Sequence, residues 1–308
     1  MPLKTNCHYF DFSIKHPEIL DARYMFLNWD KDIDKYIKTT KKLKELLATI
    51  KTLKSAKQNA DAFYAELHNL IMNKFSSKSE LNCFVNACDA TTKTIKNDLN
   101  SFKHIVDLYL KHRDFTEITP KEWIQAIIDK GASRAKGSVG EDKLLEIAAK
   151  SGFIIANDWN KFLQNKKVAA KFSKNNFDIA HIKEHLGIDL KFNSQGKMLD
   201  IILKNNDKYV FIEAKHLKEG GGSQDKQIKE LIGIIQKPTA GNNIFHGAFL
   251  DGIYSNEILN DIEQAPLKAY GKTKVISQQT DIVNALKTNK NSLWLNTAGY
   301  TEFIKDFS

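Results

Sequence analysis

Proline, glycine and cysteine are scarce in this chain of 308 residues, which contains five, 15 and three of them respectively. The cysteines, Cys7, Cys83 and Cys88, are an odd number without the spacing of a zinc site, which argues against a disulfide framework or a metal finger. No apolar run approaches the roughly 20 residues of a membrane span, and the first residues lack the apolar core of a secretory signal. These absences predict a soluble cytoplasmic protein with no membrane partner.

Glycine and proline are missing altogether between Lys31 and Thr119, so nothing interrupts helical structure there. Apolar residues in this stretch recur at spacings of three or four, or sums of these, which is the period of an amphipathic helix. The positions are Ile33, Ile37, Leu43, Leu47, Ile50 and Leu53. We therefore predict a helical N-terminal region, residues 1–130, followed by a second domain, residues 131–308.

Basic residues exceed acidic ones, giving a formal net charge of +9 and an isoelectric point of about 9.1. One interpretation is a lysine-rich composition spread over a solvated surface. The other is attraction to a polyanion, most simply nucleic acid. Charge alone barely separates the two, so the decision depends on a specific site.

The most informative residues lie in two neighbouring stretches that read as strands, residues 197–203 and 209–215, joined by an Asn-Asn-Asp turn. Because side chains alternate along a strand, Glu213 and Lys215 share one face, and the hairpin brings Asp200 beside them. Two carboxylates and an ammonium in apolar strands are costly to bury without a purpose. The acids can hold a divalent cation through oxygen ligands, while the lysine orients a water.

Asp200, followed after a gap by Glu213-Ala214-Lys215, resembles the PD-(D/E)xK nuclease superfamily, with Leu199 where the family has proline. Glu141-Asp142-Lys143 and Asp189-Leu190-Lys191 also fit the tripeptide pattern. Only Glu213-Ala214-Lys215 has an aromatic and β-branched lead-in and a hairpin partner that carries an acid. The resemblance covers roughly residues 138–254, a typical domain length.

By resemblance, the fold is α/β: a restriction-endonuclease-like αβββαβ core with a mixed central sheet, beside the N-terminal helices. The order we expect along the chain is a helix from Ser138, strands over 188–192, 198–203 and 209–216, a helix over 223–236 and a strand over 244–254. Residues from about 152 to 186 are then interpreted as an insertion before the sheet.

The resemblance also implies roles for the motif residues. Asp200 and Glu213, with the backbone carbonyl of Ala214, would bind Mg²⁺, for which Mn²⁺ can substitute. Lys215 would contact the attacking water or the scissile phosphate, as general base or as positioner. The competing interpretations are a strand-end acid for Asp200, a structural ion pair between Glu213 and Lys215, and an exposed strand lysine.

Glu141 has two interpretations. It lies three residues after Ser138 and would complete a capping box at the start of a helix. The apolar residues Leu144, Leu145 and Ala148 share its helical face, and this face is expected to pack on the sheet. Several family members supply another acid from this helix, so Glu141 is also a candidate catalytic residue.

The first functional hypothesis is a sequence-specific, Mg²⁺-dependent endonuclease of double-stranded DNA, a type II restriction enzyme acting as a homodimer in a prokaryotic cytoplasm. The N-terminal helices would embrace DNA or form the dimer. A cognate DNA methyltransferase would act on the same sequence without necessarily binding this protein. The second hypothesis is a structure-selective repair or mobile-element nuclease, and the third is a non-catalytic DNA-binding protein that kept the fold.

Overall fold

The structure is a computed structural model, and the chain divides into two compact units: Met1–Tyr24 with Gly137–Ser308, called here the sheet unit, and Met25–Lys136, the helical unit. The described residues are 3–25, 33–74, 79–114, 116, 118–132, 139–173, 176–190, 199–239, 241–260 and 273–308. Among them, no helix is both long and apolar enough to cross a bilayer.

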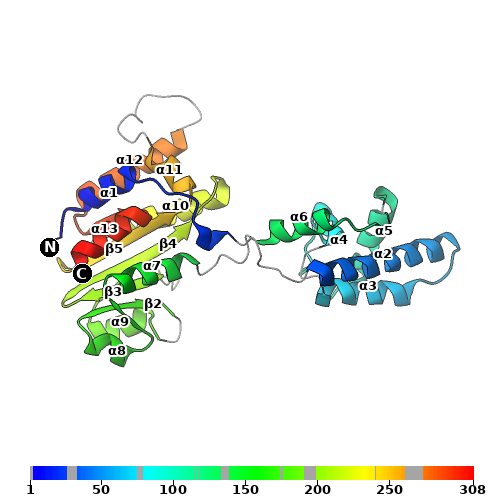
Figure 1. The fold of residues 1–308 in the computed structure, drawn as a ribbon, viewed down its shortest axis with the longest axis horizontal. Coiled ribbons are helices and arrows are strands. Elements are labelled where there is room, and N and C mark those ends of the chain that lie inside the picture. The colour runs from blue at the N-terminus through cyan, green and yellow to red at the C-terminus, as the bar shows by residue number, and fades with distance from the viewer. Residues whose placement is uncertain are drawn as a thin grey trace. The chain divides into compact units, whose positions relative to one another are not determined.

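In its described residues the helical unit contains five helices, as the absence of glycine and proline predicts (Figure 1). They are α2 (Ile33–Ser55), α3 (Asp61–Lys74), α4 (Glu80–Ala87), α5 (Leu99–His112) and α6 (Lys121–Ala132). The periodic apolar residues of α2 supply Leu43, Leu47 and Ile50 to a buried cluster shared with α3, α4 and α5. The unit therefore has a hydrophobic core of its own.

The sheet unit contains a mixed sheet of six strands in the order β1 to β6, which makes the fold α/β. The strands β2, β3 and β4 form an antiparallel meander, whereas β1 joins β2, β5 joins β4, and β6 joins β5 in parallel. Their bounds are β1 (Ile154–Ala156), β2 (Lys167–Lys171), β3 (Ile201–Asn205), β4 (Lys208–His216), β5 (Ile244–Asp251) and β6 (Ser292–Leu295).

Helices cover both faces of this sheet. On one face, α7 (Val139–Lys150) and α13 (Thr297–Phe307) bury residues such as Leu144 and Phe303 against Ile201 and Ile212. The other face is covered by α8 (Trp159–Gln164), α9 (Ile179–Leu186), α10 (Gly222–Ile235), α11 (Tyr254–Leu259) and α12 (Thr273–Thr288). The helix α1 (Asn6–Lys15) packs along β6 at the sheet edge.

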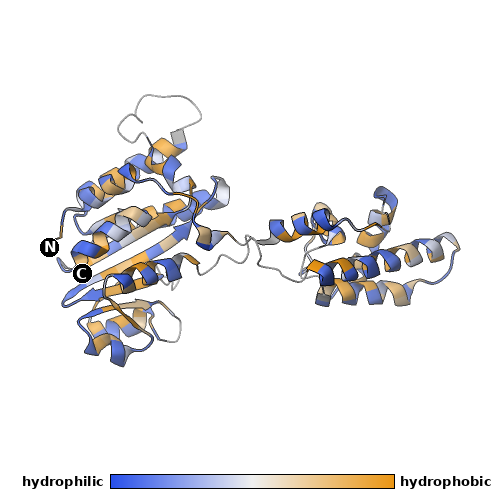
Figure 2. Cartoon of the chain, viewed as in Figure 1, coloured by the Kyte–Doolittle hydropathy of each residue, from blue (hydrophilic) through white to orange (hydrophobic). Residues whose placement is uncertain are grey.

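Burial on both faces explains why the central strands are almost continuously apolar (Figure 2). Ile201, Ile202 and Leu203 of β3 have no exposed surface, although successive side chains point to opposite faces. The hairpin turns at Asn206, whose φ of 54° is left-handed, a conformation that asparagine tolerates. The predicted hairpin is therefore present, with its first strand beginning three residues later than expected.

Three features differ from the sequence-based division. The stretch 152–186 is not an insertion, because it contains β1 and β2, and β2 is the first strand of the meander. Residues 188–190, expected to open a strand, are irregular, and 191–192 lie outside the described residues. The first 24 residues, which were expected to belong to the N-terminal helical region, instead belong to the same compact unit as the sheet.

Candidate functional site

Asp200 lies one residue before β3, where hydrogen bonds fix it to both neighbouring strands. Its carbonyl accepts the N–H of Phe172 after β2 at 2.9 Å, and its own N–H donates to the carbonyl of Ile212 in β4 at 2.8 Å. Its carboxylate atom Oδ2 accepts the N–H of Ala214 at 2.7 Å. Asp200 thus bonds to the residues on either side of Glu213, namely Ile212 and Ala214. It therefore lies beside Glu213, as the hairpin prediction requires.

Glu213 and Lys215 share a face of β4, and their side chains form an ion pair. Glu213 is 3% exposed, while the lysine side chain keeps 20% of its surface in contact with solvent. A second carboxylate, that of Glu230 in α10, lies 3.9 Å from the Lys215 ammonium. Lys215 is thus a half-buried cation between two acids rather than an exposed strand lysine.

Burial raises the pKa of the Asp200 carboxyl to about 7. The nearby carboxylate of Glu213 adds to this increase, while the amide of Ala214 and the ammonium of Lys215 oppose it. For Lys215, burial alone would lower the pKa, but the Glu213 carboxylate outweighs burial and holds that pKa above its usual value. A carboxyl poised near neutrality beside a second carboxylate is typical of functional sites.

Glu141 lies in the first turn of α7 and pairs with Lys171, the last residue of β2, at 2.5 Å. Its negative charge contributes to the raised pKa of Asp200, so it acts on the same cluster. Leu144 and Ala148 on its helical face are fully buried against the sheet, as predicted. The partner in the predicted capping box, Ser138, lies outside the described residues.

The carboxylate oxygens of this cluster suit a hard divalent cation, because such oxygens are its preferred ligands. A bound cation would also offset the repulsion from Glu213, which adds to the effect of burial on the pKa of Asp200. Within the described ranges, no group of three or more His, Cys, Asp or Glu side chains has the arrangement of a metal site. Asp200 and Glu213 are thus a pair, and Glu141 faces Lys171. The amide of Ala214 contacts Asp200; a ligand role for its carbonyl stays a prediction.

A second charged cluster lies beside this site, at the ends of β4 and β5, and sequence reasoning missed it. Lys143 of α7, 2% exposed, places its ammonium 3.1 Å from Asp251 and 3.0 Å from Asp21. Asp251 has no exposed surface and also accepts a hydrogen bond from the Tyr24 hydroxyl at 2.8 Å. We call Lys143, Asp251, Tyr24, Asp21 and their partners Glu18 and His216 the buried ionic network.

His216 follows Lys215 and connects the two clusters. Its Nδ1 atom lies 2.9 Å from Asp251, and its ring stacks on Tyr24 with 3.6 Å between ring centroids. Burial alone would lower the pKa of Lys143, but the carboxylates of Asp251 and Glu18 outweigh burial and raise it. The network therefore holds the α7 ammonium charged and fixes the end of β4.

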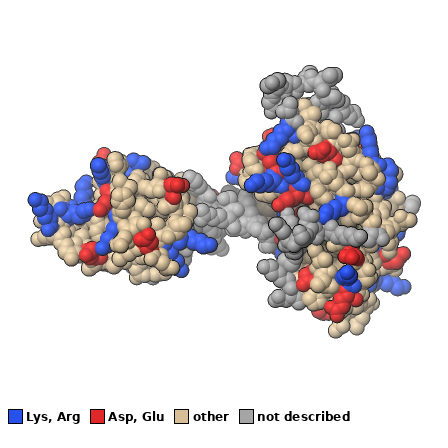
Figure 3. Space-filling model, turned by 180° about the vertical axis from the view of Figure 1, so that it is seen from behind, with Lys and Arg blue, Asp and Glu red and all other residues tan. Residues whose placement is uncertain are grey.

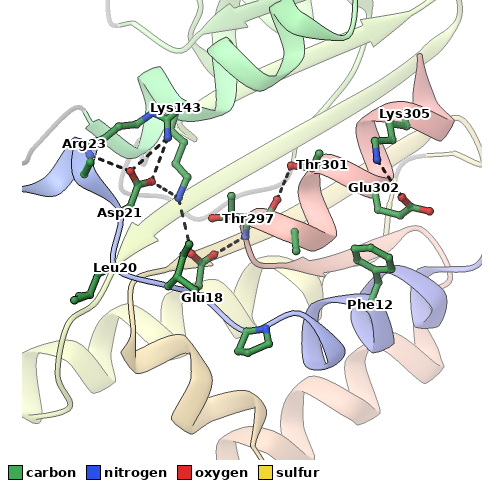
Figure 4. A pocket seen from close by; sticks show the side chains of 14 residues that line it. Phe12, Glu18, Leu20, Asp21, Arg23, Lys143, Thr297, Thr301, Glu302 and Lys305 are labelled. Carbon is green, nitrogen blue, oxygen red and sulfur yellow. Dashed lines mark hydrogen bonds and ion pairs between the residues drawn. The ribbon is translucent and has the colours of Figure 1, made fainter.

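The outer members of the network line a pocket of about 550 Å³ next to α13 (Figure 4). Glu18 there accepts the N–H of Thr297, and Arg23 donates to Glu146 at 2.8 Å. The nearby Ile19 and Leu20 are 78% and 69% exposed. The charged groups in this wall are already paired with one another.

The sequence gives little sign of the network, because its members are spread over more than 200 positions. Lys143 ends the Glu141-Asp142-Lys143 tripeptide, which fits the motif pattern but was set aside, and it stands next to the buried Leu144 in α7. Comparisons of the chain with protein-family models, with curated proteins and with solved structures found no match.

Proposed function

We propose that this protein is a divalent-cation-dependent nuclease, and more specifically a sequence-specific endonuclease of double-stranded DNA of the type II restriction kind. The observation that carries the proposal is the cluster of Asp200, Glu213 and Lys215 at the end of the β3–β4 hairpin. Burial, and after it repulsion from Glu213, raises the pKa of Asp200 to about 7. Structural ion pairing alone is a poor reason to bury such a group.

In this proposal, Asp200 and Glu213 hold Mg²⁺, and Mn²⁺ can replace it. When bound, the ion supplies Lewis acidity toward the phosphate. The ammonium of Lys215, kept protonated by Glu213 and Asp200, stabilises negative charge that develops on the phosphate or orients the attacking water. The amide of Ala214 fixes the rotamer of Asp200 through its hydrogen bond.

The order of elements gives independent support. Along the chain, α7 precedes the meander β2–β3–β4, and α10 and then the parallel strand β5 follow it. With β1, α8 and α9 set aside, this is the order of the αβββαβ core that the motif implies for a restriction-endonuclease-like fold. The strand β1 and the helix α8 lie between α7 and β2, and α9 lies between β2 and β3.

The charge distribution is consistent with a nucleic-acid substrate. The helical unit carries 20 Lys and Arg residues against 14 Asp and Glu, so it holds +6 of the net charge of +9. On the face drawn in Figure 3, basic side chains stand among acidic ones in both units. A modest, spread excess of positive charge attracts a duplex without specifying its sequence, so the helical unit is our candidate for the DNA-embracing or dimer-forming part.

The test is digestion of a supercoiled plasmid with Mg²⁺ or with EDTA, followed by sequencing of the ends. We expect cuts at one fixed sequence that require Mg²⁺ and that Asp200→Ala and Glu213→Ala abolish. Asp189→Ala is the matched control, because Asp189-Leu190-Lys191 fits the same tripeptide pattern but Asp189 is an exposed acid paired with Lys183. Equal cutting by Asp200→Ala and the wild type would overturn the assignment.

The same assay separates the other candidate functions. A preference for branched or flapped DNA over plain duplex identifies a structure-selective nuclease. Binding without any Mg²⁺-dependent cutting identifies a non-catalytic DNA-binding protein. The complete set of two acids and a lysine, with its raised Asp200 pKa, favours catalysis over the non-catalytic reading.

A further inference from the structure

The end of β4 that carries the candidate site is paired on one side only. Before Glu213 the strand pairs with both β3 and β5, whereas residues 213–216 pair, among the described residues, with β5 alone. On the open side, the amide of Ala214 donates to the side chain of Asp200 rather than to a backbone carbonyl. The segment that contains Glu213 and Lys215 therefore lacks, on that side, the ladder that holds a central strand.

His216, the last residue of β4, is held at this end by contacts on three sides. Its Nδ1 atom lies 2.9 Å from Oδ1 of Asp251, its cross-strand partner in β5. Its ring stacks on Tyr24 with 15° between the ring planes. Gly252 lies against the edge of the ring, where a Cβ atom would come within 3.0 Å of Cε1. The ring therefore has little freedom, although 21% of the side chain is exposed.

The carboxylate that holds His216 is itself fixed. Asp251 has no exposed surface, and its other oxygen, Oδ2, accepts hydrogen bonds from the Lys143 ammonium at 3.1 Å and the Tyr24 hydroxyl at 2.8 Å. Because Lys143 belongs to α7, the contact of His216 with Asp251 fastens the open end of β4 to both β5 and α7. A partner that is anchored in this way can orient the functional group next to it.

Lys215 is the functional group that such an anchor would serve. Its ammonium pairs with Glu213 and lies 3.9 Å from Glu230 of α10, so its position depends on where the strand backbone places its stem. A displacement of about 1 Å at a reacting group costs on the order of 100-fold in rate. A strand end with one free side needs a tether to keep that accuracy.

We propose that His216 is a positioning residue of the candidate site: it fixes the open end of β4 and thereby holds the Lys215 ammonium beside Glu213. Successive side chains of a strand point to opposite faces, so His216 acts on Lys215 through the backbone that they share. The kinetic consequence rests on the proposed nuclease function, whereas the position of Lys215 is measurable without it.

The first measurement follows Lys215 in the full-length protein without DNA. A limiting amount of a water-soluble amine-acylating reagent is added to the native protein, and peptide mass spectrometry gives the modification of each lysine. We expect Lys215 to be modified several-fold faster in His216→Ala than in the wild type. His216→Asn should restore the protection, because its amide can donate to Asp251 from the place of Nδ1. Lys204 of β3, which is 8% exposed, is the internal reference for general loosening.

The second measurement is the rate of single-turnover cleavage at saturating DNA. In His216→Ala it should fall by about 10–100-fold, while the affinity for duplex in Ca²⁺ stays within about twofold, because only the step that needs Lys215 is affected. His216→Asn should stay close to the wild type. The matched control is His181→Ala, since Nδ1 of His181 also lies 2.9 Å from a carboxylate, that of Asp178. It should match the wild type in both measurements.

Unchanged modification of Lys215 in a folded His216→Ala, or an equal rise at Lys204, would overturn the inference. If thermal unfolding shows that the alanine variant is not folded, His216→Gln takes its place, because its amide lies one bond farther along the side chain. Faster modification of Lys215 in a protein that never cuts DNA leaves the positioning role standing and removes the nuclease proposal. Equal cleavage by the wild type and His216→Ala does the reverse.

Discussion

Lys143 and Asp251 form an ion pair of 3.1 Å between side chains that are 2% and 0% exposed. The pair joins the first turns of α7 to the end of β5, and through His216 and Tyr24 it also reaches β4 and the N-terminal segment. Burying a pair of charges stabilises a fold only when the remaining hydrogen bonds are made. Asp251, with three donors around it, meets that condition.

The first prediction concerns this pair. Lys143→Met should lower the free energy of unfolding by about 3–5 kcal/mol, because it leaves the Asp251 carboxylate buried without its cation. Urea denaturation measures the loss, and Lys183→Met, on an exposed pair, should change it by less than about 1 kcal/mol. The double variant Lys143→Met/Asp251→Leu should lose less than the sum of the single variants. Additive losses would show that the two groups are not coupled.

A second prediction follows from the Asp200 pKa of about 7 in the metal-free protein. The folded state holds this proton more tightly than the unfolded chain, whose Asp titrates near 3.8. The stabilisation is therefore fully present below about pH 4, and it is lost as the pH rises toward 7. Asp200→Asn keeps the neutral form at every pH.

In EDTA, the stability of Asp200→Asn relative to the wild type should accordingly rise between pH 4 and pH 7 and stay constant above. The difference should be on the order of a few kcal/mol. Chemical denaturation of both proteins across this range gives the curve. A constant difference between the two proteins from pH 4 to pH 8 would contradict the raised pKa.

The third prediction separates the two readings of Glu141. Glu141→Gln can still complete a capping box, so a purely structural role predicts unchanged cleavage. If Glu141 is a member of the site, its negative charge is needed. We then expect the cleavage rate to fall by about tenfold or more, while the free energy of unfolding changes by less than about 1 kcal/mol. Single-turnover cleavage and thermal unfolding supply the two numbers. If neither the cleavage rate nor the unfolding free energy changes, the role of Glu141 is structural only.

A fourth prediction tests the chain reversal after Asp251. Gly252 has a φ of 85°, and a Cβ atom there would lie 2.3 Å from the carbonyl oxygen of Leu217. Gly252→Ala should therefore destabilise the protein by about 2 kcal/mol or more. Gly233→Ala in α10, where a Cβ meets nothing within 4 Å, should stabilise it by up to about 1 kcal/mol. Urea denaturation of both variants checks the opposite signs.

The parts of the fold that the sequence predicted are those with a local signal. The β3–β4 hairpin has apolar strands on either side of an Asn-Asn-Asp turn, and the helical unit has periodic apolar residues without breakers. The motif then brought Asp200, Glu213 and Lys215 together correctly, because register and alternation fix their faces.

The missed parts lack such signals. The strand β2, Lys-Val-Ala-Ala-Lys, is buried on both faces, so its sequence does not alternate between apolar and polar residues. Its two alanines give no preference for a strand, because alanine is also a strong helix former. Lys171 was overlooked with it. The buried ionic network depends on contacts between Lys143, Asp251 and Tyr24, and pairing over such distances leaves no periodic trace in a single sequence.

The sheet unit is discontinuous along the chain, since it stops at Tyr24 and resumes at Gly137. Its two broken ends are tied to each other: Lys143 contacts Asp21 at 3.0 Å, and Arg23 contacts Glu146 at 2.8 Å. Closing a loop costs little more free energy when the loop is longer. We therefore expect the chain between Tyr24 and Gly137 to tolerate replacement of the helical unit by another module, with the hairpin and its acids keeping their geometry.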